Sequence, residues 1–176
     1  KEDILDADVM IVRTRTQCNA ELLEGTSVKM ISTATIGTDH IDLDYCSRNG
    51  IVVANAAGCN AGGVMQYVFY GIAARKGIKL DDATFGIVGV GNVGSKIDEM
   101  AQHLGFKVLR CDPPRAQEEG PEGFCSLEYL LEHSQIVTMH VPLDDMTRGM
   151  ADETFFALMQ PGAIFINAAR GEVIDE

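Results

Sequence analysis

Two spacings of hydrophobic residues alternate along this chain. Short apolar runs rich in β-branched residues are separated by segments in which apolar residues recur every three or four positions, the spacing of one helix face. Continuous apolar strands alternating with helices are typical of a parallel sheet that helices cover on both faces. The sequence therefore predicts an α/β fold of doubly wound parallel sheets. Strands are expected at residues 9–13, 29–34, 51–55, 85–90, 107–111, 136–141 and 163–167, and helices at 19–24, 41–48, 61–76, 93–104, 127–133 and 153–159.

Polar segments divide this pattern. The turn-rich stretch "DPPRAQEEGPEG", residues 112–123, predicts an exposed loop. The polar segment 76–84 separates two strand–helix series, so we expect a domain boundary there. Residues 1–76 then form a first domain that ends in a crossing helix, and residues 77–176 form a second domain.

Composition and charge exclude several classes of protein. The 176 residues carry a net charge of −12, which would repel nucleic acid and anionic membranes. No apolar run approaches the ~20 residues of a membrane span, so we expect no membrane partner. The five cysteines form no CxxC pair. This argues against a disulfide framework or a metal site and favours reduced thiols in the cytoplasm.

The stretch "TFGIVGVGNVG" ends a predicted strand and runs into a predicted helix. Gly89 permits the tight turn, Gly91 lets the backbone approach a pyrophosphate, and Gly94 lets the helix pack closely on the strand. The helix amino end then turns N–H groups toward phosphate. A glycine-rich turn without a ligand would share the motif alone, but here strand, motif, helix and next strand follow in order. We therefore expect a Rossmann-type dinucleotide-binding domain.

The next strand of this unit ends at Asp112, 18 residues after Gly94. An acidic side chain there can accept hydrogen bonds from both hydroxyls of an adenosine ribose. It would also repel the 2′-phosphate of NADP. The predicted cofactor is therefore NAD.

Further stretches match one known family. "GIVGVGNVG", "CDPPRA", "HVPL", "TRGM" and "PGAIFINAARGEVID" together resemble the NAD-dependent D-2-hydroxyacid dehydrogenases. The front-half stretches "MIVRTRTQCNAELL", "STATIGTDHID" and "AAGCNAGGVMQYVF" narrow the resemblance. They are most similar to a branch that oxidises a phosphorylated four-carbon 2-hydroxy acid in the synthesis of pyridoxal 5′-phosphate. The similarity covers essentially the whole chain.

The resemblance implies two flavodoxin-like units and a homodimer in the full-length protein. The first unit, partial here, would hold the phosphorylated 2-hydroxy acid through Thr14 and Thr35, and the second would bind NAD. By the same resemblance, Asn92 and Val93 lie at the pyrophosphate and Asp112 at the ribose. With the glycines and the residues that line the rest of the cofactor, the implied contacts are Gly89, Gly91, Asn92, Val93, Gly94, Asp112, Val141, Ala168, Ala169 and Arg170.

Arg170 follows an apolar run, residues 163–166, at the carboxyl end of a strand predicted to be buried. Ligands bind at this end of parallel sheets. A 2-hydroxy acid needs a group that fixes its carboxylate and polarises its C2 oxygen beside the nicotinamide. A guanidinium is permanently charged and forked for this task. A surface pair with Glu172 is the alternative, but in the context "NAARG" we predict that Arg170 is catalytic.

The family also uses a general acid/base histidine and a glutamate that orients it, both downstream of this turn. The sequence up to Glu176 lacks them, so we expect them beyond it with the last strands of the sheet, and we expect the first strand of the substrate domain before Lys1. The histidines present are not expected to replace that base. His103 and His133 are expected to face solvent on helices. His40 is expected to structure a loop, and His140 to end a strand near the cofactor.

Two other functions stay open. One is another activity of the same family, such as phosphoglycerate or glycerate dehydrogenase. The other is an NAD-binding regulator without turnover, although the presence of Arg170 argues against it. Gln66, in "VMQYVF", stands where the family usually has glutamate, which leaves any role of that acid open.

Overall fold

The computed structural model describes residues 1–75 and 83–175, which fall into two compact units, Lys1–Cys59 and Asn60–Glu176. In the first unit the elements are η1 (Glu2–Ile4), β1 (Val9–Val12), α1 (Ala20–Leu23), β2 (Met30–Thr33), α2 (Leu43–Arg48) and β3 (Val52–Asn55). In the second they are α3 (Ala61–Ala74), β4 (Thr84–Val88), α4 (Asn92–His103), β5 (Lys107–Cys111), α5 (Pro113–Glu119), α6 (Leu127–His133), β6 (Ile136–Met139), α7 (Glu153–Leu158), β7 (Ile164–Asn167) and η2 (Gly171–Val173).

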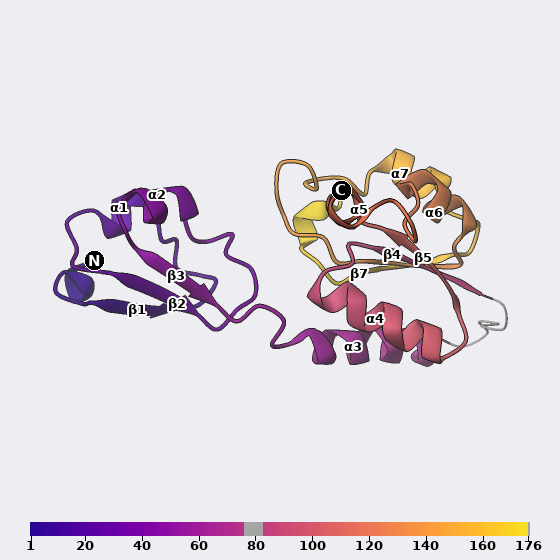
Figure 1. Cartoon of the computed structure of the whole chain (residues 1–176), viewed down its shortest axis with the longest axis horizontal. Coiled ribbons are helices and arrows are strands. Elements are labelled where there is room, and N and C mark those ends of the chain that lie inside the picture. The colour runs from indigo at the N-terminus through magenta and orange to yellow at the C-terminus, as the bar shows by residue number, and fades with distance from the viewer. Residues whose placement is uncertain (76–82, 176) are drawn as a thin grey trace. The chain divides into compact units, whose positions relative to one another are not determined.

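The first unit is a parallel sheet of order β1-β2-β3 with α1 and α2 on one face (Figure 1). Met10 and Ile31 point to that face and pack with Leu23 of α1. Side chains alternate across a strand, so Val9 and Ile11 point the other way, and Ile11 is 82% exposed. Coverage of both faces, expected from the sequence, is therefore wrong for Lys1–Cys59 taken by itself.

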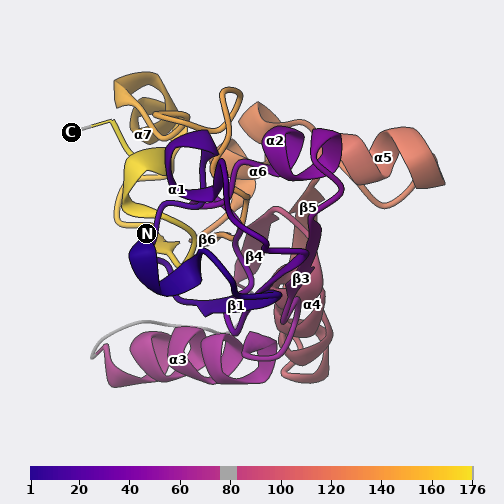
Figure 2. The same ribbon diagram turned by 90° about the vertical axis from the view of Figure 1, so that its left-hand side faces the viewer.

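The second unit is a parallel sheet of order β5-β4-β6-β7, and helices cover both of its faces (Figures 1 and 2). On one face, Phe85 and Ile87 of β4 pack with Ile97 of α4. On the other face, α6 and α7 close a second layer of the core around Val88 and Met139. This arrangement buries β4 and β6. Because all four strands are parallel, their carboxyl ends lie at one edge of the sheet.

Helix α3 packs in the second unit rather than the first. Its buried side chains Val68 and Ile72 lie in the same cluster as Phe85 and Ile87, and α3 packs against α4 (Figure 1). The compact units therefore separate before α3, whereas the sequence placed this helix at the end of the first domain. The predicted boundary itself falls at residues 76–82, which lie outside the described residues, and it stays a prediction.

The expected exposed loop over residues 112–123 is wrong, because α5 occupies Pro113–Glu119. Asp112 caps this helix: its Oδ1 accepts a hydrogen bond from the Arg115 N–H at 3.0 Å. Proline is tolerated in a first helical turn, where its missing N–H would have no intrahelical partner. Gly120, with a φ of 99°, then ends the helix. Two prolines that suggest a loop instead start a short helix.

The described residues contain neither a membrane-spanning helix, nor a metal-binding cluster, nor a disulfide. None of the helices in residues 1–75 and 83–175 has the length and apolar character of a membrane span. Within the same residues, no group of three or more His, Cys, Asp or Glu side chains is arranged to hold a metal ion. All five cysteines are free thiols, three of them buried: Cys18, Cys46 and Cys111.

Candidate active site

The register of the second sheet aligns its candidate residues at one edge. Val88 pairs with Cys111 on one side and with Met139 on the other, and Met139 pairs with Asn167. The residues that follow these strand ends therefore leave the sheet side by side. They are the glycine turn after β4, Asp112 after β5, His140 and Val141 after β6, and Ala168 to Arg170 after β7. The strand order reverses at β4, so this edge lies at the switch point where nucleotides bind in such sheets.

The three glycines of the turn meet different constraints. Gly89 has a φ of 85°, and a Cβ on it would lie 2.9 Å from the backbone of His140 and Val141. A Cβ on Gly94 would strike the carbonyl oxygen of Gly89. A Cβ on Gly91, by contrast, would meet nothing within 4 Å, and its φ of −76° suits any residue. Gly89 and Gly94 are thus required by the fold, whereas Gly91 keeps open a space that the protein does not fill.

The amino end of α4 opens onto that space. Gly91 is its N-cap and supplies no side-chain cap, and no acidic residue lies in the first turn. The N–H groups of this turn, with Asn92 and Val93 among them, are therefore left to an external acceptor, and the helix dipole favours an anion there. The open glycine position and the uncapped helix fit a pyrophosphate. These residues could accordingly hold the phosphates of a dinucleotide.

Asp112 and Arg115 hold the Val90 peptide of the glycine turn from both sides. Asp112 Oδ2 accepts a hydrogen bond from the Val90 N–H at 2.7 Å. The Arg115 guanidinium donates to the Val90 carbonyl at 2.6 Å, and its other nitrogens pair with both carboxylate oxygens of Glu119 at 2.7 and 2.8 Å. Asp112 therefore anchors the turn in addition to the ribose contact that the sequence predicts for it. Its carboxylate keeps lone pairs for hydroxyl donors, since each oxygen accepts one bond within the protein.

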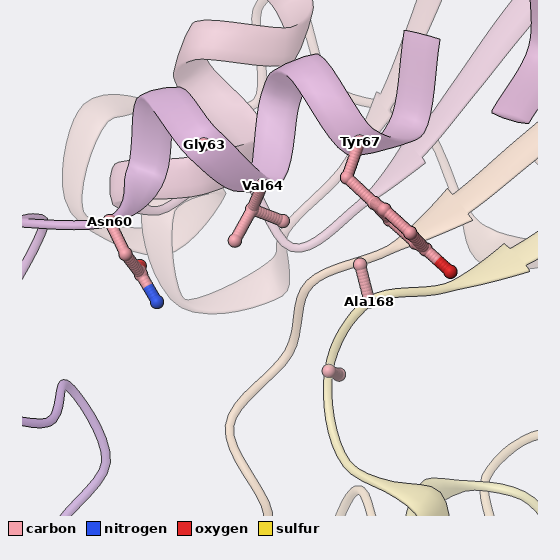
Figure 3. Close-up of a pocket in the computed structure, with 6 residues that line it drawn as sticks. Asn60, Gly63, Val64, Tyr67 and Ala168 are labelled. Carbon is pink, nitrogen blue, oxygen red and sulfur yellow. The ribbon is translucent and has the colours of Figure 1, made fainter. Parts of the chain in front are cut away.

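Arg170 is half-buried beyond the end of β7. The strand that delivers it was expected to be buried, but Ile164–Asn167 are each only partly covered, because β7 lies at the edge of the sheet that the described residues form. Before it, Ala168 and Ala169 form one wall of a pocket of about 430 Å³. Figure 3 shows Asn60, Val64 and Tyr67 of the opposite wall projecting toward Ala168, from the start of α3 and its first turns. The turn that carries Arg170 thus borders a small hollow at the ligand-binding edge.

His140 lies at the same edge of the sheet, and its own imidazole is neutral at pH 7. Its N–H continues the ladder to the Val88 carbonyl at 2.7 Å, and its Nε2 lies 2.8 Å from the Thr138 hydroxyl. Its Nδ1 is buried without a protein partner. Burial lowers the pKa of His140 from 6.5 to about 4. The residue therefore adds no positive charge at neutral pH.

Replacing His140 by glutamine is expected to weaken the pH dependence of stability. Between pH 6.5 and 4 the unfolded chain binds a proton at this position and the folded chain does not, so the free energy of unfolding falls as the pH falls. The contribution is about 2–3 kcal/mol. Urea unfolding of the full-length protein at pH 7 and pH 4.5 should show a smaller loss in His140→Gln than in wild type.

The first unit gathers its own candidate residues at one edge. Val12 pairs with Thr33, so the segments that carry Thr14 and Thr35 leave the sheet beside each other. Thr14 is exposed in a turn. Thr35 makes side-chain hydrogen bonds: its hydroxyl lies 2.7 Å from that of the buried Thr33 and donates to the Gly37 carbonyl at 3.2 Å. The two threonines predicted to contact substrate thus share one sheet edge.

Several residues at these edges have no role in the sequence interpretation. Arg115 was assigned to a loop, although the spacing of Asp112 to the following prolines is compatible with a helix cap. Tyr67 and Asn60 lie on α3, where nothing in the hydrophobic pattern distinguishes a pocket wall from a solvent face. Asn167, the first residue of "NAARG", has no assigned role in the sequence interpretation, although asparagine at a strand end is a turn signal. His40 is buried, and its backbone carbonyl accepts from the Cys18 N–H at 2.7 Å, while the loop-structuring role of its side chain stays a prediction.

Comparison with known proteins defines the class. The family model for the D-isomer specific 2-hydroxyacid dehydrogenase, NAD binding domain, matches residues 64–176. The chain therefore belongs to the D-2-hydroxyacid dehydrogenase family of oxidoreductases, and its second unit carries the NAD-binding domain. The Rossmann assignment and NAD as cofactor are confirmed.

Curated relatives narrow the similarity further. The chain is 49% identical to erythronate-4-phosphate dehydrogenase of Bacteroides thetaiotaomicron over 99% of the chain and 52% of that protein. It is 46% identical to erythronate-4-phosphate dehydrogenase of Ectopseudomonas mendocina, over 98% of the chain and 46% of that protein. The chain thus spans about half the length of these relatives.

Solved structures agree on the fold. D-lactate dehydrogenase from Aquifex aeolicus, complexed with NAD and lactic acid, superposes with a TM-score of 0.86 at 29% identity, covering 99% of the chain and 60% of that structure. NAD+-bound 3-phosphoglycerate dehydrogenase of Entamoeba histolytica gives 0.85 at 34% identity, covering 99% and 59%. The α/β class with parallel sheets is confirmed.

Proposed function

We propose that the full-length protein oxidises 4-phospho-D-erythronate to its 2-oxo acid with NAD, as a step of pyridoxine biosynthesis. One observation carries the substrate: the curated relatives at 46–49% identity, all erythronate-4-phosphate dehydrogenases, match both units rather than the cofactor domain alone. We further propose a homodimer in the cytoplasm, where five free thiols are typical.

The second unit supplies the cofactor site and the carboxylate clamp. Bound NAD supplies the hydride acceptor. The N–H groups at the start of α4 hold its pyrophosphate, Asp112 accepts from its ribose hydroxyls, and Val141 with Ala168 and Ala169 lines its remaining length. Arg170 pairs with the substrate carboxylate and polarises the C2 oxygen. Charge pairing in a partly dry site strengthens as charge shifts to that oxygen.

The C2 hydroxyl must also lose its proton. We propose that a histidine oriented by a glutamate accepts it, as the family resemblance implies. His140 is unsuited to this task, because its imidazole is buried and burial lowers its pKa to about 4. A positioned acid/base contributes about 10²- to 10⁴-fold in rate. In this proposal Arg170 binds the carboxylate and polarises the C2 oxygen, and the histidine with its glutamate accepts the proton.

The first unit is proposed to read the substrate phosphate. Arg13, Thr14 and Arg15 are exposed together just past β1, in a chain whose net charge is −12. A local basic, hydroxyl-bearing group in an acidic protein favours a small anion. We propose that Thr14, with Arg13, contacts the phosphorylated end, and that Thr35 on the neighbouring segment contacts the substrate as well.

Thr14→Val should raise KM for the phosphorylated acid far more than for its dephosphorylated analogue. The lost hydrogen bond to a charged group is worth about 1.5–3 kcal/mol, or roughly 10- to 150-fold in KM. Steady-state kinetics of the full-length protein with 4-phospho-D-erythronate and D-erythronate measures this ratio. Thr154→Val, on the exposed surface of α7, is the matched control. An equal rise for both acids would contradict a phosphate contact.

A second candidate, oxidation of 3-phosphoglycerate, is favoured by one structural neighbour. The 3-phosphoglycerate dehydrogenase of Entamoeba histolytica is 34% identical, more than the lactate enzyme. Both candidate substrates carry a carboxylate for Arg170 and a phosphate for Arg13 and Thr14. They differ by one carbon between these groups, so the ratio of their kcat/KM values decides between the two candidates.

A further inference from the structure

The turn that carries Arg170 is held by a side chain to which the function assigns no task. Asn167, the last residue of β7, makes two hydrogen bonds with the backbone beyond it. Its Oδ1 accepts from the Ala169 N–H at 2.9 Å, and its Nδ2 donates to the Arg170 carbonyl at 2.7 Å. An N–H needs an acceptor and a carbonyl needs a donor, so these partners also fix which way the amide faces.

The two bonds lie on either side of the Arg170 Cα. The first fixes the peptide that enters Ala169, and the second fixes the peptide that leaves Arg170. The last ladder bond of this edge runs from the Ala168 N–H to the Met139 carbonyl at 3.2 Å. Beyond Ala168 the ladder to β6 stops. The turn is then held by the Asn167 amide and by a longer bond, 3.4 Å, from the Val173 N–H to the Arg170 carbonyl.

This location matters because the described sheet holds β7 through β6, and the ladder between them stops at Ala168. A turn beyond the end of a ladder would otherwise sample several backbone conformations, and each would aim the long arginine side chain differently. A planar amide with both ends engaged removes that freedom at the base of the side chain. The same turn forms the Ala168–Ala169 wall of the pocket (Figure 3).

We infer that Asn167 is a positioning residue, which locks the turn so that the Arg170 guanidinium meets the carboxylate of a 2-hydroxy acid in one orientation. This inference rests on the proposed function for its substrate. It assigns Asn167 no contact with substrate or cofactor. Its effect on the substrate passes through Arg170, because both hydrogen bonds end on the backbone of the turn that carries this side chain.

A double-mutant cycle in the full-length protein tests this. Asn167→Ala is expected to lower kcat/KM for the 2-hydroxy acid by about 10- to 100-fold, the range for a misplaced reacting group, and to leave the Kd of NAD within about twofold of wild type. In an Arg170→Ala background the same change is expected to cost less than about twofold, because the group that it positions is gone. A full additional loss in that background would overturn the inference.

Amide hydrogen exchange supplies a readout that does not need turnover. Exchange across residues 169–171 is expected to speed up in Asn167→Ala. Asn167→Asp keeps the acceptor for the Ala169 N–H but loses the donor, so it should show an intermediate rate. Asn49→Ala, which deletes a 2.8 Å side-chain bond to the Tyr45 carbonyl at the surface of α2, should leave these residues and kcat/KM unchanged.

The two hypotheses fail in different ways. If the wild-type protein oxidised no 2-hydroxy acid, the proposed function would be wrong, and exchange would still decide on the clamp. Unchanged exchange across residues 169–171 in Asn167→Ala would show that the Asn167 amide does not hold the turn, and would overturn the inference whatever the activity. Faster exchange with wild-type kcat/KM would show that the turn need not be fixed, and would equally overturn the positioning role.

Discussion

Replacing Arg170 by alanine in the full-length protein is expected to lower kcat/KM by about 10²- to 10³-fold or more, the cost of removing one charge-stabilising donor. Arg170 follows β7 at the ligand-binding edge, directly after the pocket-wall residues Ala168 and Ala169. Steady-state kinetics gives kcat/KM, and calorimetric titration gives the Kd of NAD, which should change little.

Two further variants sharpen this test. Arg170→Lys keeps the charge but loses the forked geometry, so it should recover only part of the rate. Arg48→Ala is the matched control, because Arg48 is exposed on α2 and its guanidinium only bonds the Asp44 carbonyl at 3.2 Å. A loss of NAD affinity as large as the loss of kcat/KM would contradict a role for Arg170 on the substrate.

Gly91→Ala is expected to lower NAD affinity by about 10²-fold while leaving the fold intact. The new Cβ meets no protein atom within 4 Å, and the backbone φ of −76° suits alanine. Its methyl group would instead occupy the space in which the pyrophosphate approaches the backbone, and misplacement by about 1 Å at such a site costs on this order. Titration with NAD measures the affinity, and thermal unfolding without NAD measures the fold.

The other glycines supply the contrast. Gly94→Ala forces a Cβ against the Gly89 carbonyl, so it should lower Tm even without NAD, by the ~1–3 kcal/mol typical of overpacking. Gly71→Ala, in α3 with nothing within 4 Å, should change neither Tm nor NAD affinity. Wild-type NAD affinity in Gly91→Ala would place the cofactor elsewhere on the sheet edge.

The strands and the glycine turn could be predicted because their signals are local. Apolar runs mark β4 and β6, and the order of strand, glycines and helix marks the cofactor domain before any tertiary contact is known. The strand order is a different matter. That β7 is an edge strand with half-covered residues, or that Ile11 faces away from its core, depends on which strands are neighbours, and hydrophobicity does not encode that directly.

Helix α5 and the clamps show a second limit. The prolines after Asp112 suggest a break, yet a cap and a first helical turn accept them, so a loop was predicted where α5 stands. Asp112 was assigned to the ribose from its distance along the chain. Its bond to Val90, like that of Asn167 to Arg170, joins a side chain to a particular backbone group. Such partners become visible only when the turn geometry is known.

Oxidation of candidate substrates by the full-length protein tests the central claim most directly. NADH formation is followed by absorbance with NAD and, in parallel, 4-phospho-D-erythronate, 3-phosphoglycerate and D-glycerate. The difference of one carbon between the two phosphorylated acids should discriminate about tenfold or more in kcat/KM. The account predicts the highest kcat/KM with 4-phospho-D-erythronate. A higher kcat/KM with 3-phosphoglycerate, or no NADH from any of the three acids, would contradict it.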